Sequence, residues 1–194
     1  MKTAAIMQPT YLPWLGYFCM MDKADVFVLL DSVQFSARSW QQRNRIKTAG
    51  GEAWLTVPVH RKGRRAQLIK DTNIDSASGF PEKHLRTIEQ NYGKAPHFRS
   101  RADGLFSILN SGTENLSLMN NRLITWINSE LGITTPLLKS SNMMSGGRKA
   151  ELLAAICGEI GATHYLSAPG SKEYLDQSKA FEEHGIEISF FEYD

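Results

Sequence analysis

The chain has few cysteines, little net charge and no long apolar segment, and each scarcity excludes a class of protein. Its two cysteines, Cys19 and Cys157, lie in apolar helical patterns at a spacing that suits neither a metal site nor a redox pair, so we expect two buried free thiols in a reducing cytosol. No apolar run approaches the roughly 18 residues of a membrane span. Gln8 and Pro9 interrupt the N-terminal apolar stretch too early for a signal peptide. We therefore expect a cytoplasmic protein with no membrane partner.

The formal net charge of +2 is too small to predict nucleic acid as the main partner. Positive charge nevertheless concentrates between Arg38 and Arg65. None of the five histidines pairs with another at metal-ligand spacing, so no metal site is expected. The sequence also lacks the G-x-S-x-G, Walker and dinucleotide-binding fingerprints, and no cofactor is predicted.

Two unbroken apolar runs near the N-terminus indicate a parallel sheet. Ala4–Met7 and Val26–Leu30 show no alternation of apolar and polar residues, which is typical of strands covered on both faces. A helix from about Gly16 to Lys23 lies between them and completes a βαβ unit with a right-handed crossover. The composition, with 42% hydrophobic and 22% charged residues, is that of an ordinary globular protein, and the length fits one domain.

The rest of the chain alternates between strands and helices around a helical middle. Further strands are predicted at 54–59, 68–73, 135–139, 163–167 and 186–193. Helices are predicted at 80–91, 103–109, 120–131, 149–160 and 172–184. The pattern predicts a single α/β domain over residues 1–194, with a mainly parallel, doubly wound (Rossmann-like) sheet and a helical insertion at about 80–131. We expect about five or six strands, with the two N-terminal ones side by side at the centre.

Polar segments follow three of the predicted strands, and ligands of open parallel sheets bind beyond such carboxyl ends. The candidate site residues there are Gln8, Thr10, Tyr11, Trp14, Gly16 and Tyr17, then Asp31 and Gln34, then Ser167 and Gly170. Gly16 would let a ligand approach a helix N-terminus, which attracts anions. Asp31 would orient a hydroxyl or amine or act as a general base. The alternative is a tight turn in which Trp14 and Tyr17 are core anchors and Asp31 merely ends a strand. We expect one pocket to be lined by Tyr11, Trp14, Asp31, Gln34 and Ser167.

Two basic segments are further candidates for binding. Residues 38–47 (RSWQQRNRIK) combine four cations with three amides and a tryptophan. Such a segment would clamp a phosphate or carboxylate through Arg38, Arg43, Asn44 and Lys47, with arginine binding in a bidentate manner. The alternative is a solvated charged face. Residues Arg61 to Arg65 (RKGRR) form an exposed basic turn, either simply solvated or in contact with a polyanion such as tRNA.

Several of these segments together resemble the WbqC-like family. They are residues 8–18 (QPTYLPWLGYF), 31–35 (DSVQF), 38–47 (RSWQQRNRIK) and 165–167 (YLS) with Gly170, and the resemblance extends over essentially the whole chain. Members occur in bacterial O-antigen and other surface-polysaccharide gene clusters, and in some natural-product clusters. The resemblance implies transfer of an acyl or aminoacyl group to an amino sugar. Members commonly continue into a His-Pro and a Leu-Leu-Phe-Asn segment, so we expect part of the usual site to lie beyond Asp194.

A second resemblance concerns the N-terminal block alone. A strand followed by Pro-Thr, a second Pro, a Gly and a helix is similar to the opening of HIGH-motif nucleotidyltransferases, whose motif histidines hold the nucleotide phosphates. Here the stretch reads Trp14-Leu15-Gly16-Tyr17, so only the glycine matches and the histidines are replaced by Trp14 and Tyr17. A fold can persist where its reaction does not.

Three functional hypotheses follow from these observations. The first is a group transferase acting on a small-molecule amino sugar or nucleotide-linked sugar in surface-glycan assembly. In it Trp14 and Tyr17 stack on a ring, the basic segment holds phosphate or carboxylate, and Asp31 and Gln34 orient the acceptor. The second is a catalytically retired, nucleotide-binding accessory protein. The third is a tRNA-dependent aminoacyl-transfer protein that contacts RNA through Arg61 to Arg65. The sequence does not predict an oligomeric state.

Overall fold

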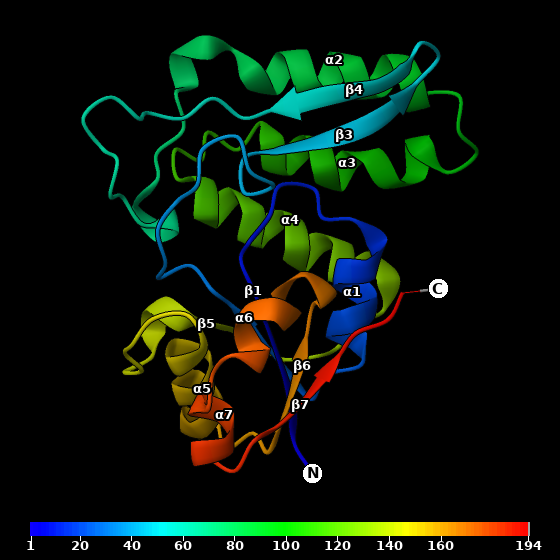
Figure 1. Ribbon diagram of the computed structural model, residues 1–194. Helices are drawn as coiled ribbons and strands as arrows, with labels where there is room; N and C mark the ends of the chain where they lie inside the picture. The colour runs from blue at the N-terminus through cyan, green and yellow to red at the C-terminus, as the bar shows by residue number, and fades with distance from the viewer. Residues whose placement is uncertain (194) are drawn as a thin grey trace. The chain divides into compact units, whose positions relative to one another are not determined.

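The computed structural model describes residues 1–193, and the chain divides into two compact units (Figure 1). The first, which we call the sheet unit, contains Met1–Gln8, Trp14–Asp31 and the chain from Gly132 onward. The second, which we call the hairpin unit, contains Pro9–Pro13 and Ser32–Leu131. Each unit is described by itself. The single-domain interpretation made from the sequence stays a prediction.

The sheet unit is built on five parallel strands in the order β5-β2-β1-β6-β7. They are β1 (Thr3–Met7), β2 (Val26–Leu29), β5 (Leu137–Lys139), β6 (His164–Ser167) and β7 (Glu187–Phe190). Numbered within this sheet alone, the order is 3-2-1-4-5, which is that of a doubly wound sheet. β1 lies at the centre with Ala4 opposite Val26 of β2. The prediction of a mainly parallel, Rossmann-like sheet with these two strands adjacent is confirmed.

Helices cover this sheet. They are α1 (Leu15–Asp22), α5 (Ala150–Glu159), α6 (Lys172–Asp176) and α7 (Ala180–Glu183). Figure 1 shows α5 and α7 together on one side of the sheet and α1 on the other. All four residues of β2 are buried, as expected of a strand covered on both faces. The helix predicted at 172–184 is two helices, because Ser178 separates them and its hydroxyl accepts a hydrogen bond from the Ala180 amide at the start of α7.

The hairpin unit contains a two-stranded antiparallel sheet and three helices. β3 (Arg43–Thr48) and β4 (Gly51–Thr56) form the hairpin, and α2 (Phe80–Tyr92), α3 (Phe98–Leu109) and α4 (Leu116–Leu131) occupy the range 80–131. Short 3₁₀ turns, η1 (Ile69–Asp71) and η2 (Ser76–Ser78), connect the hairpin to the helices. Ile46 and Leu55 face a core that also contains Tyr11, Ile88 and Leu123.

Two predicted strands differ from the structure. The run at 54–59 contributes to β4, which pairs with β3 in a separate hairpin and not with the parallel sheet. Its residues alternate between exposed and more buried, which is the pattern of a strand with one solvated face. The run at 68–73 is mostly the turn η1, with isolated bridges at Leu68 and Asn73. Its backbone curls after Leu68, where the Thr72 hydroxyl donates a hydrogen bond to the Leu68 carbonyl.

The cysteines are both free. Cys157 is fully buried in α5, and this burial raises the pKa of its thiol to about 12, so the thiol stays protonated at neutral pH. Cys19 in α1 is half-buried, which is less burial than the sequence predicted.

Candidate functional site

The order of the strands creates a switch point at the carboxyl ends of β1 and β6. These two strands are neighbours, but the chain leaves β1 toward β2 on one side and β6 toward β7 on the other. Ligands of doubly wound sheets bind in the crevice at such a point. In the sheet unit it is flanked by exposed Gln8 and exposed Gly170, the latter in the 3₁₀ turn η4 (Pro169–Ser171). Ser167 is fully buried, and its hydroxyl donates a hydrogen bond to the Ala168 carbonyl at 3.3 Å.

Trp14 stands at the start of α1 with 53% of its surface exposed. Its ring packs edge-on against Tyr193, with 5.1 Å between the ring centroids. A Cβ at Gly16 would lie 2.0 Å from the Trp14 ring, so this glycine is what allows the indole to lie over the first turn of the helix. The small residue thus makes room for an aromatic ring, whereas the sequence suggested that it makes room for a ligand.

Tyr17, the other aromatic residue predicted here, is a core residue in the structure. It is 1% exposed, and its ring contacts Phe18 and Phe27. Its hydroxyl donates a hydrogen bond to the Gln8 carbonyl at 3.3 Å, and burial raises its pKa well above the usual value. Of the two aromatic residues predicted to stack on a ligand, Trp14 is therefore the one whose ring is exposed.

Asp31 follows β2 and is 3% exposed. Its carboxylate accepts hydrogen bonds from the Ser141 amide and the Ser141 hydroxyl, both at 2.9 Å, and from the Ser140 hydroxyl at 3.2 Å. Its own amide donates to the Ser140 hydroxyl at 3.1 Å. The carboxylate therefore ties the end of β2 to the turn after β5. The three serine hydrogen bonds occupy most of the acceptor sites of the carboxylate.

In the hairpin unit, side-chain amides hold the loop Pro9–Pro13. Asn44 Nδ2 donates hydrogen bonds to the Leu12 carbonyl at 2.5 Å and to the Tyr11 carbonyl at 3.2 Å. The Tyr11 amide donates to the Trp40 carbonyl at 2.9 Å. Leu12 has a φ of +46°, a strained value for a non-glycine residue. Hydrogen bonds thus interlock the loop Pro9–Pro13 with the basic segment 38–47, and the Asn44 side chain binds the backbone of that loop.

The fully buried Asn120 of α4 reinforces this interlock. Its Nδ2 donates to the Pro9 carbonyl at 3.2 Å and to the Gln41 carbonyl at 2.8 Å. Gln42 accepts from the Arg38 amide at 3.1 Å and donates to the Val57 carbonyl at 3.1 Å. The sequence pattern did not single out Asn120, because an asparagine in an amphipathic helix gives no signal of what it binds.

Tyr11 lies in the core of the hairpin unit. It is fully buried, and its hydroxyl forms a hydrogen bond with His84 Nδ1 at 2.8 Å, while the neighbouring Thr10 is half-buried. Burial lowers the pKa of His84 to about 4, against a weaker opposing effect of a hydrogen bond with the Thr56 backbone. At neutral pH this imidazole is therefore uncharged.

One face of the hairpin is basic and aromatic. Arg43, Arg45 and Lys47 alternate along β3, and the paired register puts Thr56, Trp54 and Glu52 opposite them. The Arg43 guanidinium lies 4.2 Å from the centroid of the Trp54 ring. Of the four residues predicted to clamp an anion, Arg43 and Lys47 share this face, Asn44 points to the opposite face, and Arg38 is exposed in the preceding turn with a φ of +60°.

Gln34 and the basic turn Arg61 to Arg65 lie together in the hairpin unit. Gln34 is exposed, and its Nε2 donates to the Arg65 carbonyl at 2.8 Å. The turn is closed by a hydrogen bond from the Arg64 amide to the Arg61 carbonyl at 3.0 Å, and its side chains are exposed. The pocket predicted from Tyr11, Trp14, Asp31, Gln34 and Ser167 would draw on residues of both units and stays a prediction.

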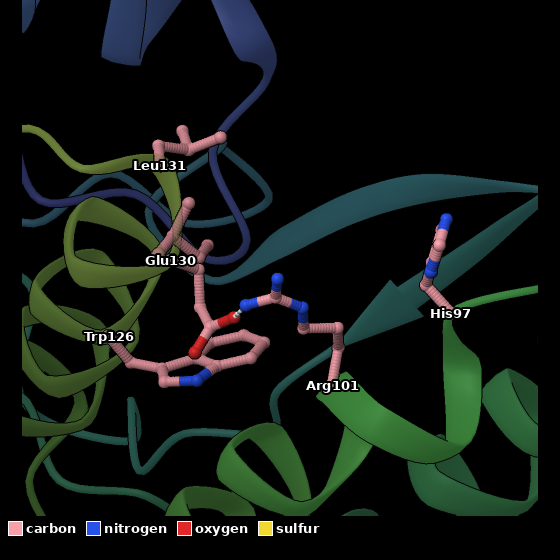
Figure 2. A pocket seen from close by; sticks show the side chains of 6 residues that line it. His97, Arg101, Trp126, Glu130 and Leu131 are labelled. Atoms are coloured by element: carbon pink, nitrogen blue, oxygen red, sulfur yellow. Dashed lines mark hydrogen bonds and ion pairs between the residues drawn. The ribbon is translucent and has the colours of Figure 1, made fainter.

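A surface pocket of about 370 Å³ lies between α3 and α4 (Figure 2). Trp126 forms its floor, an ion pair joins Arg101 to Glu130 above the ring, and His97 stands apart from that pair. A Cβ at Gly104 would lie 2.2 Å from Trp126 Nε1, so a glycine is required where the indole crosses α3. None of the lining residues was predicted from the sequence. Because Arg101 and Glu130 neutralise each other, the pocket offers a ligand little net charge.

Residues 1–193 contain no group of three or more His, Cys, Asp or Glu side chains placed to hold a metal ion. Over the same residues, no helix has the length and apolar character needed to cross a membrane.

Comparison with known proteins identifies relatives of the whole chain. It is 43% identical over 195 residues to an uncharacterized protein of Mycobacterium tuberculosis, Rv1507c, and the match covers 100% of this chain and 84% of that protein. No solved structure matches it significantly. The family model for the WbqC-like protein family matches residues 8–194, which include the interlocked loops and the switch point. The chain therefore belongs to the WbqC-like protein family.

Proposed function

We propose that this protein is a group transferase that binds an amino sugar or nucleotide-linked sugar at the switch point of its sheet. The reaction would transfer an acyl or aminoacyl group during assembly of bacterial surface polysaccharides such as O-antigen. The observation that carries the proposal is the strand order β5-β2-β1-β6-β7, whose direction reverses between β1 and β6, the point at which doubly wound sheets bind their ligands. Family membership adds the expectation, stated above, of a place in surface-glycan assembly.

The half-exposed Trp14 supplies the stacking surface in this proposal. Because Gly16 has no Cβ, there is room for this ring over the first turn of α1. An aromatic ring in this position stacks on a base or on the apolar face of a sugar. Exposed Gln8 supplies hydrogen bonds at the same strand end. Asp31 acts as a positioning residue, because its carboxylate fixes the ends of β2 and β5 through Ser140 and Ser141.

The chemistry of such a transfer is a nucleophilic substitution at an acyl carbon. The amine nitrogen of the sugar attacks the carbonyl carbon of an activated thioester or ester donor. A C–N bond forms, the bond to the leaving thiol or alcohol breaks, and the amine loses a proton to the solvent or to a base. Proximity and orientation of the two substrates supply much of the rate enhancement in such reactions.

The first test is ligand-induced thermal stabilisation. We expect a nucleotide-linked amino sugar to raise the melting temperature more than the free nucleotide or the free sugar does. A ligand at one hundred times its Kd adds about 2.7 kcal/mol to the free energy of unfolding. Trp14→Ala should abolish the shift. Leu15→Ala is the matched control, because Leu15 is 55% exposed, against 53% for Trp14, and lies next to it in the chain.

The second test separates an enzyme from a binding protein. The protein is incubated with a nucleotide-linked amino sugar and either an acyl-CoA or an aminoacyl-tRNA, and mass spectrometry measures the mass added to the sugar. Acylated product that disappears with Trp14→Ala supports the transferase. Binding without product under either donor favours the nucleotide-binding accessory protein. No stabilisation by any sugar or nucleotide would refute the switch-point site.

A further inference from the structure

The two units carry opposite charge. The hairpin unit contains 15 of the 22 Lys and Arg residues but 8 of the 20 Asp and Glu residues, which gives it a net charge of +7. The sheet unit has the remaining 7 basic and 12 acidic residues, a net charge of −5. The near-neutral total of the chain conceals this asymmetry, and a strongly basic unit attracts polyanions.

The cations of β3 form a row on the solvent face of the hairpin. Arg43, Arg45 and Lys47 alternate along one strand, so neighbouring cations are about 6.8 Å apart along its axis. Within the exposed face, Glu52 pairs with Arg45 at 2.5 Å. An extended single strand of nucleic acid presents its phosphates in a row of similar spacing. The arrangement therefore suits an extended polyanion better than a compact one.

Two tryptophans lie open beside this row. Trp40 and Trp54 are 48% and 47% exposed, and their ring centroids are 5.6 Å apart at an interplanar angle of 33°. The Arg45 guanidinium lies 5.7 Å from the Trp40 ring and 5.5 Å from the Trp54 ring. Nearly half of each large apolar side chain faces water, which is the kind of exposure that marks interaction sites.

We propose that this hairpin face binds single-stranded nucleic acid. Bases stack on the open parts of Trp40 and Trp54, while Arg43, Arg45 and Lys47 hold the phosphates. Stacking on aromatic rings combined with a cationic track is how proteins hold single strands without reading a sequence. A duplex keeps its bases stacked on each other and cannot use the tryptophans. The inference goes beyond the proposed function and concerns residues of the other unit.

Fluorescence anisotropy with labelled oligonucleotides tests the proposal. The probes are an oligo-uridine and an oligo-thymidine of equal length, an RNA duplex of that length, and a heparin fragment as a polyanion without bases. Either single strand should bind at least about tenfold more tightly than the duplex or heparin, the worth of roughly one stacked base, and should quench tryptophan fluorescence. A stronger response to oligo-uridine than to oligo-thymidine identifies RNA as the natural source. Three neutralised phosphates predict a slope of about −2 for log K against log salt.

Variants locate the site. Trp54→Ala and Trp40→Ala should each weaken oligo-uridine binding by about tenfold. Trp54→Phe, which keeps an aromatic ring, should retain most of the wild-type affinity. Arg45→Ala should reduce the salt slope by about 0.7. Leu118→Ala, which removes a 40%-exposed apolar residue from α4 of the same unit, is the control and should change nothing. Circular dichroism confirms that each variant is folded.

Three outcomes would overturn the proposal. Absence of oligonucleotide binding removes it outright. Equal binding of single strand, duplex and heparin, with unchanged affinity in both tryptophan variants, makes the face a general polyanion surface. Loss of oligo-uridine binding in Trp14→Ala, with Trp40→Ala and Trp54→Ala unaffected, moves the nucleotide contact to the switch point and leaves the proposed function intact. Failure at the hairpin therefore does not count against the transferase.

Discussion

The two units provide hydrogen-bond partners for their buried backbone groups in different ways. In the sheet unit, β1 is paired with β2 on one side and β6 on the other, so its polar backbone groups are used in regular hydrogen bonds. In the hairpin unit, the loop Pro9–Pro13 has no such partner strand, and Asn44 and Asn120 donate to its carbonyl groups instead. Buried backbone groups require partners in either case.

This difference shows why a polar motif is an ambiguous sign of a binding site. The amides of residues 38–47 suggest ligand contacts in the sequence, yet Gln42 and Asn44 hydrogen-bond to the backbone. Asp31 of the sheet unit is likewise engaged by two serines. Trp14 in the sheet unit and Trp40, Trp54 and Arg45 on the hairpin face, by contrast, are exposed.

Lowering the pH should destabilise the hairpin unit more than the sheet unit, and this is the largest effect we expect. Burial lowers the pKa of His84 in the hairpin unit to about 4, from 6.5. Between these values the unfolded chain binds a proton that the folded chain does not, so the free energy of unfolding falls as pH falls through this window. The loss should reach as much as about 3 kcal/mol. Urea unfolding at pH 7 and pH 4.5 measures it.

Hydrogen exchange at pH 4.5 measures whether the hairpin unit loses more stability than the sheet unit. Amides of α2, which contains His84, should lose protection before those of β1. In His84→Gln the dependence of stability on pH should flatten, whatever the absolute stability of the variant. An unchanged pH dependence in that variant would assign the effect to other groups.

Removing the amide of Asn120 tests the role of side chains in the hairpin unit. Asn120→Ala removes the hydrogen bonds that the Pro9 and Gln41 carbonyls accept from this side chain and should lower the free energy of unfolding by about 2–3 kcal/mol. Asn91→Ala is the control, because Asn91 is exposed on α2 and should change stability by less than about 0.5 kcal/mol. Equal effects of the two substitutions would contradict the conclusion that the Asn120 side chain stabilises the loop Pro9–Pro13.

Asp31→Ala makes the corresponding test in the sheet unit. The substitution removes the acceptor of three hydrogen bonds from Ser140 and Ser141 and should cost about 2 kcal/mol in urea unfolding. Asp31→Asn keeps one acceptor oxygen and should cost less. If stability is unchanged while sugar acylation is lost, Asp31 is a catalytic residue and not a positioning one.

The smallest effect is expected at the exposed ion pair of the hairpin. Arg45 and Glu52 are 44% and 64% exposed, so Glu52→Gln should change the free energy of unfolding by less than about 0.5 kcal/mol. The same substitution frees Arg45 and should tighten oligo-uridine binding. Loss of binding would show that the ion pair positions Arg45. Anisotropy and urea unfolding on the same preparation separate the two effects.

The sequence predicted the parallel sheet well, because a strand buried on both faces has a pattern of its own. The apolar runs 4–7 and 26–30 lie within the observed strands or extend one residue beyond them, and the strands predicted at 163–167 and 186–193 contain β6 and β7. The hairpin was missed. Its first strand, RNRIKT, has a single large apolar residue, Ile46, and the cations that line its solvent face look like a binding segment.

By itself, the sequence determined the fold class, the adjacency of β1 and β2 and the family, because these follow from local apolar patterns and from contiguous motifs. Only the tertiary structure decided what each polar side chain does. Whether Asn44 meets a ligand or the Leu12 carbonyl, and whether Asp31 is free or held by Ser141, depends on residues that are 32 and 110 positions apart. The chain brings such partners together only by folding, so a local pattern carries no record of them.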